Sequence, residues 1–226
     1  MNYATLKRQV QLTTGLLESQ VDASFDLAVR QTEEQLFYQL KLTESIRTAS
    51  LTALTQSEVD ALRIAEGDSS NTGAFWRLPG DLESLISVAI NGQVIGLGNP
   101  VADFAYYYSD DPADGVFKYV IKNVQGEQLM TLIPPSSSGR NNIVYFTKID
   151  SLVLEQGATE SAEDFAARQD AAVNPILAKY FTTYLHGTSV ELGAYYGDAQ
   201  LLTIHGPLFD KMIMNAQKRE EAELGA

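Results

Sequence analysis

The dipeptide Asn91–Gly92 constrains the fold of this chain more than any other feature of its sequence. It separates two apolar runs within LESLISVAINGQVIGLG (residues 82–98). Both residues tolerate the positive φ of a type I′ turn, so such a pair is a strong signal for a two-residue β-hairpin. The segment VFKYVIKNVQGEQLMTLIP (residues 116–134) predicts a second hairpin, and NNIVYFTKID (residues 141–150) a further strand. The middle of the chain is therefore expected to be β-structure.

Helical periodicity occupies both ends of the chain. In VDASFDLAVRQTEEQLFYQLKL (residues 21–42), apolar side chains recur at spacings of three, four or seven, which defines one face of an α-helix. Asp22 is expected to cap this helix. Asn174–Pro175 predicts a second helical region, because Asn caps helices and proline suits the first helical position. Asp198 is expected to cap a final helix, which Gly206–Pro207 should kink or restart.

These patterns predict an α+β fold. The N- and C-terminal helices are expected to form a helical bundle, and the central strands an antiparallel β-sheet or small barrel. We place an α-helical domain at residues 1–72 together with 174–226, and a β domain at residues 73–173.

The chain is strongly acidic, with 29 Asp or Glu against 16 Lys or Arg and a formal net charge of -13. The phosphates of nucleic acid are repelled by such a charge, so specific DNA binding is disfavoured. An acidic wall nevertheless suits a channel through which DNA slides without adhering. The composition therefore allows DNA as a passing neighbour and not as a specific ligand.

The chain contains no cysteine, which excludes disulfides, thiolate nucleophiles and Cys-ligated zinc. No apolar run approaches the ~20 residues that span a bilayer. The N-terminal stretch MNYATLKRQVQLTTG is too polar for a signal peptide. We therefore expect synthesis in the cytoplasm and no membrane partner.

The run GLGNP (residues 96–100) raises the question of a phosphate-binding turn. Such a turn needs a strand, a loop and then a helix whose N-terminus faces the phosphates. The same run opens the peptidyl-tRNA hydrolases, but there a Gly and soon afterwards a His follow, whereas Val101 follows here and the first His is His186. We therefore interpret Gly96 and Gly98 as the end of a strand.

The other candidate chemical groups are sparse. His186 and His205 could form a two-histidine metal site, but no H-E-x-x-H or similar spacing accompanies them, and burial within helices is the favoured interpretation. Asp110–Asp111 and Glu163–Asp164 lack the apolar setting that raises the pKa of a catalytic acid. We expect no catalytic residue, no metal and no cofactor.

Two runs of tyrosine suggest contact surfaces. Successive residues of a strand or turn point in different directions, so some of these rings must face outward. Tyrosine is enriched in protein–protein interfaces, and no basic setting favours nucleic acid here. The candidate interface residues are Tyr106, Tyr107, Tyr108, Tyr195 and Tyr196.

The order of elements resembles the head-to-tail adaptor proteins of tailed bacteriophages, also called connector or gatekeeper proteins. That family has a helix with an acidic pair, a Leu-Pro-acidic run feeding a strand, an apolar strand ending in proline, and two closing helices joined before an Asp. The corresponding stretches are DLAVRQTEEQLFYQL (residues 26–40), FWRLPGDLESLISV (75–88), LMTLIPPSSSGRNNIVYFTKI (129–149) and residues 174–219. Residues 52–70 and 155–172 look like insertions, and Pro207 interrupts a helix that the family usually keeps continuous.

The resemblance implies a structural virion protein without enzymatic activity. Family members form a ring of copies, usually dodecameric, between the portal protein and the tail nozzle or tail tube, and they take part in genome packaging and ejection. The ring continues the channel through which DNA passes. Carried over here, the helical domain would be portal-proximal, the β domain would be tail-proximal, and tail fibres would be a further candidate partner.

The resemblance also implies a portal-docking segment in the C-terminal helix. The residues that it selects are Phe209, Met212, Ile213, Lys218 and Arg219. The alternative is that the three apolar residues of this set simply pack on the helix at 175–191, because apolar helix stripes usually face a core.

Two other functional classes stay open at the level of sequence. One is a hydrolase, for example of glycans, that uses Asp or Glu beside a tyrosine platform; Glu83 and Asp103 are candidates that no motif selects. The other is a small-ligand binding module, which would be stabilised against heat by its ligand.

Overall fold

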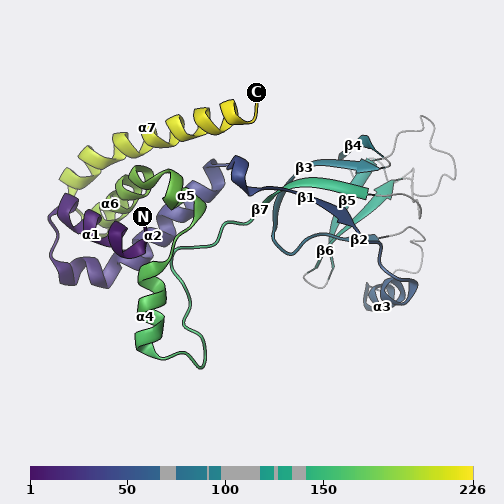
Figure 1. Cartoon of the computed structure of the whole chain (residues 1–226), viewed down its shortest axis with the longest axis horizontal. Helices are drawn as coiled ribbons and strands as arrows, with labels where there is room; N and C mark the ends of the chain where they lie inside the picture. Colours follow the sequence, from purple (N-terminus) through teal and green to yellow (C-terminus); the bar gives the residue numbers. More distant parts are fainter. Residues whose placement is uncertain (67–74, 91, 98–117, 125–126, 134–140, 226) are drawn as a thin grey trace. The chain divides into compact units, whose positions relative to one another are not determined.

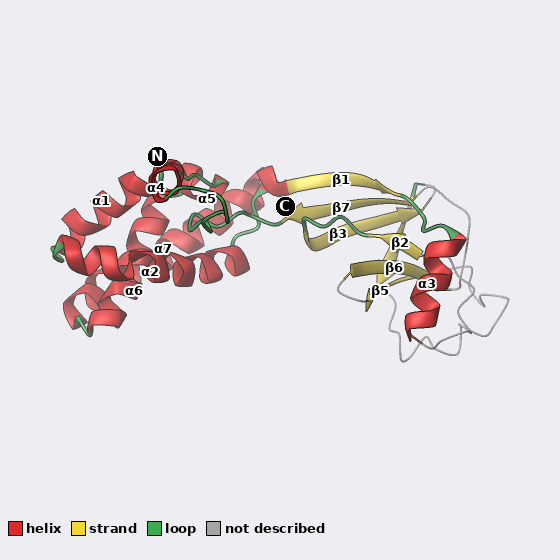
Figure 2. Ribbon diagram, turned by 90° about the horizontal axis from the view of Figure 1, so that it is seen from below, coloured by secondary structure: helices red, strands yellow, loops and turns green. Residues whose placement is uncertain are grey.

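The chain folds into two compact units, shown in Figures 1 and 2. The computed structural model describes residues 1–66, 75–90, 92–97, 118–124, 127–133 and 141–225. One unit, Met1–Ser45 with Ile149–Ala226, is helical, and the other, Ile46–Lys148, holds the strands and one helix. The chain is thus an α+β protein with helices and a central sheet, as the sequence predicts.

The helical unit begins and ends with long helices. Its elements are α1 (Tyr3–Thr14), α2 (Glu18–Gln39), the short 3-10 helix η1 (Thr43–Ser45), α4 (Ala162–Ala171), α5 (Pro175–Lys179), α6 (Phe181–Tyr196) and α7 (Ala199–Glu223). Asn174 and Asp198 cap α5 and α7 with their side chains, as the sequence predicts. The cap predicted at Asp22 is wrong, because α2 begins one turn earlier and Asp22 instead pairs with Lys7 of α1 at 2.7 Å.

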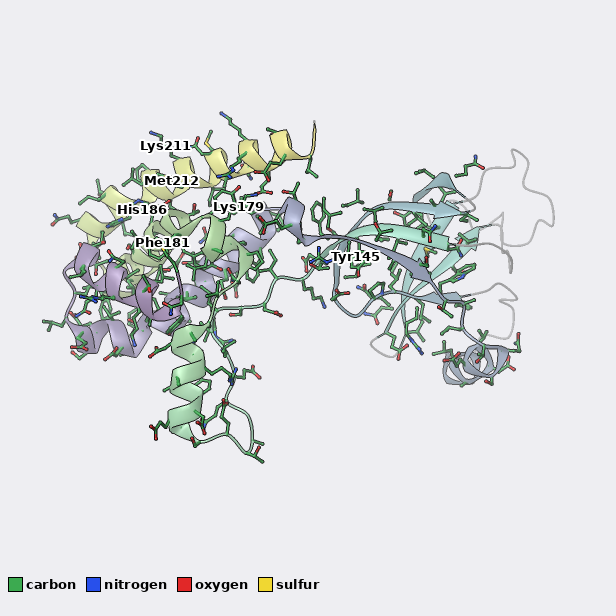
Figure 3. The ribbon with its side chains drawn as sticks, in the orientation of Figure 1. Tyr145, Lys179, Phe181, His186, Lys211 and Met212 are labelled. Carbon is green, nitrogen blue, oxygen red and sulfur yellow. The ribbon has the colours of Figure 1, made fainter. Side chains whose placement is uncertain are left out.

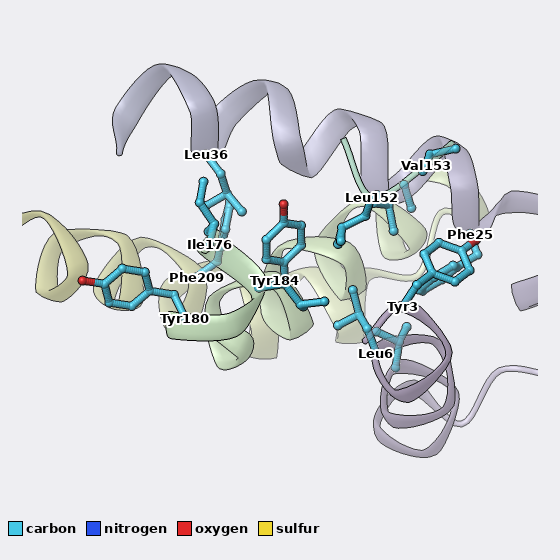
Figure 4. Close-up of a cluster of buried hydrophobic side chains, with 14 of the residues drawn as sticks. Tyr3, Leu6, Phe25, Leu36, Leu152, Val153, Ile176, Tyr180, Tyr184 and Phe209 are labelled. Carbon is cyan, nitrogen blue, oxygen red and sulfur yellow. The ribbon is translucent and has the colours of Figure 1, made fainter. Parts of the chain in front are cut away.

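The core of the helical unit lies where α1, α2, α6 and α7 meet. Tyr184 of α6 is fully buried and lies beside Leu152 and Leu36, which Figure 4 shows with their neighbours. Burying each side chain of this size contributes roughly 1.5–3 kcal/mol. The buried residues of this core include Leu6, Val10, Phe25, Val29, Leu36, Leu152, Ile176, Leu177, Tyr184, Leu192, Phe209 and Ile213.

Helix α7 runs without a break through Gly206–Pro207, so the predicted restart does not occur. Leu201 and His205 before the proline and Phe209 after it are buried on one face, so packing stabilises both halves of the helix. Gly206 assists, because part of the clash that disfavours a helical residue before proline involves its Cβ, which glycine lacks.

The second unit contains seven strands among its described residues. They are β1 (Ile46–Leu51), β2 (Phe75–Arg77), β3 (Leu82–Ile90), β4 (Gln93–Leu97), β5 (Lys118–Val124), β6 (Glu127–Ile133) and β7 (Asn141–Thr147), with α3 (Gln56–Glu66) after β1. The strand order is β1-β7-β3-β4-β5-β6-β2. The β3–β4 hairpin turns at Gly92, whose φ of 85° fits the Asn-Gly prediction.

The sheet departs from the antiparallel prediction at one pair and closes on itself. Strands β4 and β5 are parallel, through Gly96 opposite Lys118 and Leu97 opposite Tyr119. The chain that follows β1 pairs with β2, at the other end of the strand order: Ala53 bridges Trp76, and Leu54 N–H donates to Phe75 O at 2.7 Å. Of the two predicted forms, the described strands therefore fit the small barrel.

The interior of this unit is built around Trp76, which is only 2% exposed. Trp76 packs with Leu82, Val88, Met130 and Ile143 of the neighbouring strands. A smaller cluster places Val59 of α3 against Phe75, Val124 and Leu129. Gly96 lies in β4, as expected for a strand residue, whereas Gly98 lies outside the described residues.

The boundaries between the two units differ from the sequence prediction. Residues 46–66 belong with the strands, because β1 pairs along its whole length with β7, from Ile46 opposite Phe146 to Leu51 opposite Asn141. Residues 149–173 belong with the helices, because Leu152 and Val153 are buried in the helical core. Local periodicity does not encode either relationship, since both depend on partners distant in sequence.

Candidate functional site

Helix α7 has a buried face and an outer face, and the predicted docking residues divide between them. Phe209 and Ile213 are each 4% exposed and belong to the helical core, so they do not offer a docking surface. Met212 is half-buried. Lys218 and Arg219 are exposed, and Arg219 Nε donates to Glu223 Oε1 at 3.1 Å. The alternative of packing within the helical unit therefore holds for the two largest apolar residues of the set.

Phe209 is buried because α6 offers it a glycine. A Cβ at Gly187 would lie 2.7 Å from Phe209 Cε2 and 2.5 Å from Cγ2 of Thr32. Three helices, α2, α6 and α7, therefore approach each other closely at this one position. The Phe209 ring occupies space that a side chain at position 187 would otherwise fill.

The outer face of α7 combines exposed apolar and basic side chains. Ile204 and Leu208 are 48% and 36% exposed, and Lys211 and Lys218 continue the same face at helical spacing. Neither lysine forms an ion pair among the described residues. Figure 3 labels Lys211 and Met212 on α7 and His186 on the neighbouring α6. We call Ile204, Leu208, Lys211, Asn215 and Lys218 the outer stripe of α7; it contains no acidic residue.

The C-terminal end of α7 binds Thr43, which lies in the segment where the chain passes from the helical unit to the second unit. Glu220 is 2% exposed, and its Oε2 accepts the backbone N–H of Thr43 at 2.8 Å and the Thr43 hydroxyl at 2.7 Å. Lys179 Nζ lies 2.8 Å from Glu220 Oε1 and 2.7 Å from Glu223 Oε2. The hydroxyl of Tyr180 also donates to Glu220.

The charges around Glu220 shift the pKa values of the whole cluster. Although burial alone would raise it, the hydrogen bonds from Lys179, Thr43 and Tyr180 hold the pKa of Glu220 at about 2. Burial and the neighbouring carboxylate raise the pKa of Tyr180 to about 12. The Lys179 pKa is raised by its two glutamates in spite of desolvation. At neutral pH, Glu220 and Lys179 are therefore ionised and paired, and Tyr180 is a neutral hydrogen-bond donor.

A second buried glutamate, Glu33, binds residues 151–152, where the chain re-enters the helical unit after the second unit. Glu33 of α2 is 3% exposed, and its Oε1 accepts the backbone N–H of Leu152 at 2.7 Å and the Tyr184 hydroxyl at 3.1 Å. The Ser151 hydroxyl donates to its other oxygen. Burial raises the pKa of Glu33 more than these hydrogen bonds lower it.

The two glutamates thus both bind a segment next to the second unit, but in the part of the chain that the structure describes only Glu220 is paired with a lysine. Each accepts one backbone N–H and one Ser or Thr hydroxyl from a segment next to the boundary between the units, at Thr43 or at Ser151–Leu152. Each also accepts a Tyr hydroxyl, from Tyr180 or Tyr184 at the start of α6. Lys179 neutralises Glu220, whereas no ion pair to Glu33 exists among the described residues. We call Glu33 and Glu220 the anchor glutamates.

The two histidines are brought together, which sequence spacing does not reveal. Nδ1 of His186 lies 2.9 Å from Nδ1 of His205, and the ring planes are inclined by 36°. His205 is 3% exposed, in line with the prediction of a buried helix residue. Desolvation lowers the pKa of both rings, and for His205 the neighbouring His186 adds to this. In the described part of the chain, no cluster of three or more metal-binding side chains occurs.

The candidate interface tyrosines are only partly described. Tyr195 is 59% exposed, whereas the Tyr196 hydroxyl donates to Gln20 O at 2.7 Å and lies 3.1 Å from Ser24 Oγ. Tyr195 therefore remains a surface candidate, and Tyr196 joins α6 to α2. Tyr106, Tyr107 and Tyr108 lie outside the described residues.

The carboxylates considered for hydrolysis show no shared site. Glu163 and Asp164 lie in the first turn of α4, where the N–H of Asp164 donates to the capping hydroxyl of Ser161. Glu83 is exposed on β3. Asp103, Asp110 and Asp111 lie outside the described residues.

Two surface grooves are lined by none of the candidate carboxylates that the structure describes, although a hydrolase would need them there. A groove of about 580 Å³ runs between α4 and the 150–155 segment, and its basic residue, Arg168, is already paired with Glu160 at 2.8 Å. A smaller groove of about 360 Å³ in the second unit is lined by Arg77, Leu82 and Lys148, among others. Arg77 is paired with Glu127 at 2.9 Å.

The anchor glutamates were missed by sequence reasoning, although a signal was present. Glu33 lies four residues after Val29 and three before Leu36, and Glu220 lies four residues after Ala216, so both occupy positions of an apolar helix stripe. A carboxylate in such a position is buried and must find donors. The donors that it binds come from segments distant in sequence, so the helix pattern does not predict them.

The chain matches no family model and no curated protein. Among the described residues, no helix combines the length and apolar character needed to cross a bilayer. Function is therefore inferred from the residues and their geometry.

Proposed function

We propose that the chain is a structural subunit of the head-to-tail adaptor of a tailed bacteriophage. In this role it forms a ring with copies of itself between the portal and the tail nozzle or tube, and DNA passes through the ring without specific binding. The observation that carries the proposal is the outer stripe of α7. A 25-residue terminal helix that exposes apolar and basic side chains together is suited to docking on another protein.

The composition of the stripe agrees with a docking role. The chain has a net charge of -13, yet the five residues of the outer stripe include two lysines and no acid. Burial of Ile204 and Leu208 would supply affinity, and the lysines would select an acidic partner surface and raise the rate of association. In the adaptor hypothesis that partner is the portal protein.

The anchor glutamates support a load-transmitting role. An adaptor must keep its portal-facing and tail-facing parts connected while DNA is packaged and ejected. Here both connections between the units are fastened to the helical unit by buried carboxylates, and one of these, Glu220, belongs to α7 itself. The proposed docking helix is therefore directly bonded to one of the two connections.

The test is to count the chain in purified particles and then to disrupt the outer stripe. Quantitative mass spectrometry against the major capsid protein should give a copy number that fits one dodecameric ring per particle. The double variant Ile204→Glu/Leu208→Glu should reduce co-purification with the portal protein encoded in the same genome by about tenfold or more.

The matched control is Leu27→Glu, which also places a carboxylate at an exposed apolar site, 46% exposed, but on α2 and outside the outer stripe. It should bind the portal protein as the unmodified chain does. Absence of the chain from particles, or equal binding by the double variant and the control, would overturn the proposal.

A further inference from the structure

The two histidines of the chain lie side by side between α6 and α7. His186 and His205 face each other through Nδ1 atoms 2.9 Å apart. His205 is buried, while His186 is half-buried and so connects the pair to the surface. The contact fixes both imidazole rings in a defined mutual orientation, since each is carried by a packed helix.

This separation agrees with the spacing of two ligands on one metal ion. With metal–nitrogen distances of about 2.0 Å, two ligands at right angles lie about 2.8 Å apart, whereas tetrahedral ligands lie about 3.3 Å apart. The observed 2.9 Å is close to the right-angle value. Square-planar or tetragonal geometry with nitrogen ligands is typical of Cu²⁺ and Ni²⁺.

We propose that His186 and His205 form a bidentate site for a divalent transition-metal ion that binds imidazole, such as Cu²⁺ or Ni²⁺, with water in the other coordination positions. The inference does not rest on the adaptor proposal. It assigns the pair a chemistry that neither residue has alone, because each ring supplies one ligand and the two helices set the angle between them.

Metal binding changes the tautomer of the pair and not its net charge. Without metal, one ring donates its Nδ1 proton to the Nδ1 lone pair of the other, so the donor ring is the Nδ1–H tautomer. Coordination by both Nδ1 atoms requires both rings to carry their proton on Nε2. The donor ring therefore moves one proton from Nδ1 to Nε2 through solvent, and no proton is lost overall.

A bound ion would fasten α6 to α7 near the start of α7. The two helices already meet closely there, because Gly193 of α6 would place a Cβ 2.9 Å from Leu201 Cβ. An ion that binds only the folded chain stabilises it by mass action. At a hundredfold excess over its dissociation constant it should raise Tm by about 5 °C or more.

The chain offers a clean background for the test. It contains only these two histidines and no cysteine, so a full-length protein freed of any affinity tag has no other imidazole or thiol ligand. Calorimetric titration with CuCl₂, NiCl₂ and, as a negative control, MgCl₂ should show one Cu²⁺ or Ni²⁺ site and no response to Mg²⁺. Electron paramagnetic resonance of the Cu²⁺ complex should show hyperfine coupling to two equatorial imidazole nitrogens.

The single variants His186→Gln and His205→Gln should each weaken Cu²⁺ binding by about tenfold or more, since each removes one of two nitrogen ligands. Asp210→Asn, which removes an exposed carboxylate from α7, is the matched control and should bind as the unmodified chain does. Equal affinity in the histidine variants and the control would overturn the proposal. A copper spectrum of the unmodified chain without two nitrogen couplings would do so as well, even if the variants failed to fold.

Discussion

Glu33 accepts the backbone N–H of Leu152 at 2.7 Å, although 119 residues separate the two in sequence. The whole second unit lies between them in the chain. This hydrogen bond therefore attaches the segment that follows the second unit to α2. In the same way, Glu220 attaches the segment before the second unit to α7, through Thr43. The helical unit is thus assembled from two chain segments, before and after the second unit. Its two buried carboxylates bind Thr43 and Leu152, which lie just before and just after that unit in the chain.

Truncation of Glu33 should destabilise the chain strongly. In Glu33→Ala, the N–H of Leu152 and the hydroxyls of Ser151 and Tyr184 lose a buried acceptor, and we expect a loss of about 3 kcal/mol in the free energy of unfolding. Glu33→Gln keeps one acceptor oxygen and should cost about 1 kcal/mol. Urea unfolding measures both, and Glu34→Gln on the exposed side of the same turn should change stability by less than about 0.5 kcal/mol. A small loss in Glu33→Ala would show that the anchor does not contribute.

The raised pKa of Glu33 predicts how the cost of Glu33→Gln varies with pH. A carboxyl group whose pKa is higher in the folded state keeps its proton there while the unfolded chain has lost it. Its contribution to stability is therefore present at acid pH and falls as the pH rises through its folded pKa. Glu33→Gln should cost more near pH 4 than near pH 7, which urea unfolding at the two values compares directly. The opposite trend would contradict the assignment.

Glu220 should show the reverse dependence. Its pKa is about 2 in the folded chain against about 4.5 unfolded, so its contribution is complete above about pH 4.5 and is lost as the pH falls toward 2. The difference between these two pKa values corresponds to roughly 3 kcal/mol. Thermal unfolding of Glu220→Gln between pH 2 and 6 should show a flatter pH profile than that of the unmodified chain. Glu221→Gln, an exposed neighbour, should retain the steep profile.

Gly187 should not tolerate any side chain. In Gly187→Ala the new Cβ would lie within 2.7 Å of Phe209 and 2.5 Å of Thr32, so α7 or α2 must shift, and we expect a loss of about 2–3 kcal/mol. Gly157→Ala is the control, because its Cβ would meet Glu160 Cβ at an ordinary 3.5 Å. Chemical denaturation of the two variants distinguishes close packing from a general effect of replacing glycine. Equal stability would mean that the helices adapt freely.

Sequence reasoning reached the elements that local chemistry determines and missed those set by distant partners. Asn91–Gly92 predicted the β3–β4 hairpin, and Asn174 and Asp198 predicted two helix starts, because turn and cap geometry involve only near neighbours. The pairing of β1 with β7 and the parallel β4–β5 contact join strands far apart in the chain or separated by a long connection. Periodicity predicts that a strand exists but not which strand lies beside it.

The candidate docking surface shows the same limit. Phe209 and Ile213 are spaced by four, and so are Ile204 and Leu208, so both pairs satisfy the pattern of an apolar helix face. The first pair is buried and the second is exposed, and Phe209 lies where α6 carries Gly187. A glycine within a helical pattern is the sequence signal for a close approach between helices, but it does not identify the side chain that fills the space.

Replacement of Pro207 should stabilise α7. Proline lacks the N–H that would bond to the carbonyl of Thr203, and an interior proline costs a helix about 3 kcal/mol relative to alanine. Because Pro207 is exposed and the helix is continuous around it, Pro207→Ala restores the hydrogen bond without disturbing the core, and Tm should rise by several degrees. The control is Thr203→Ala, which removes only the side-chain hydrogen bond to Ala199 O and should change Tm little. A fall in Tm for Pro207→Ala would instead show that packing of α7 against α6 depends on a bend imposed by the proline, because a straight helix would then fit the core less well.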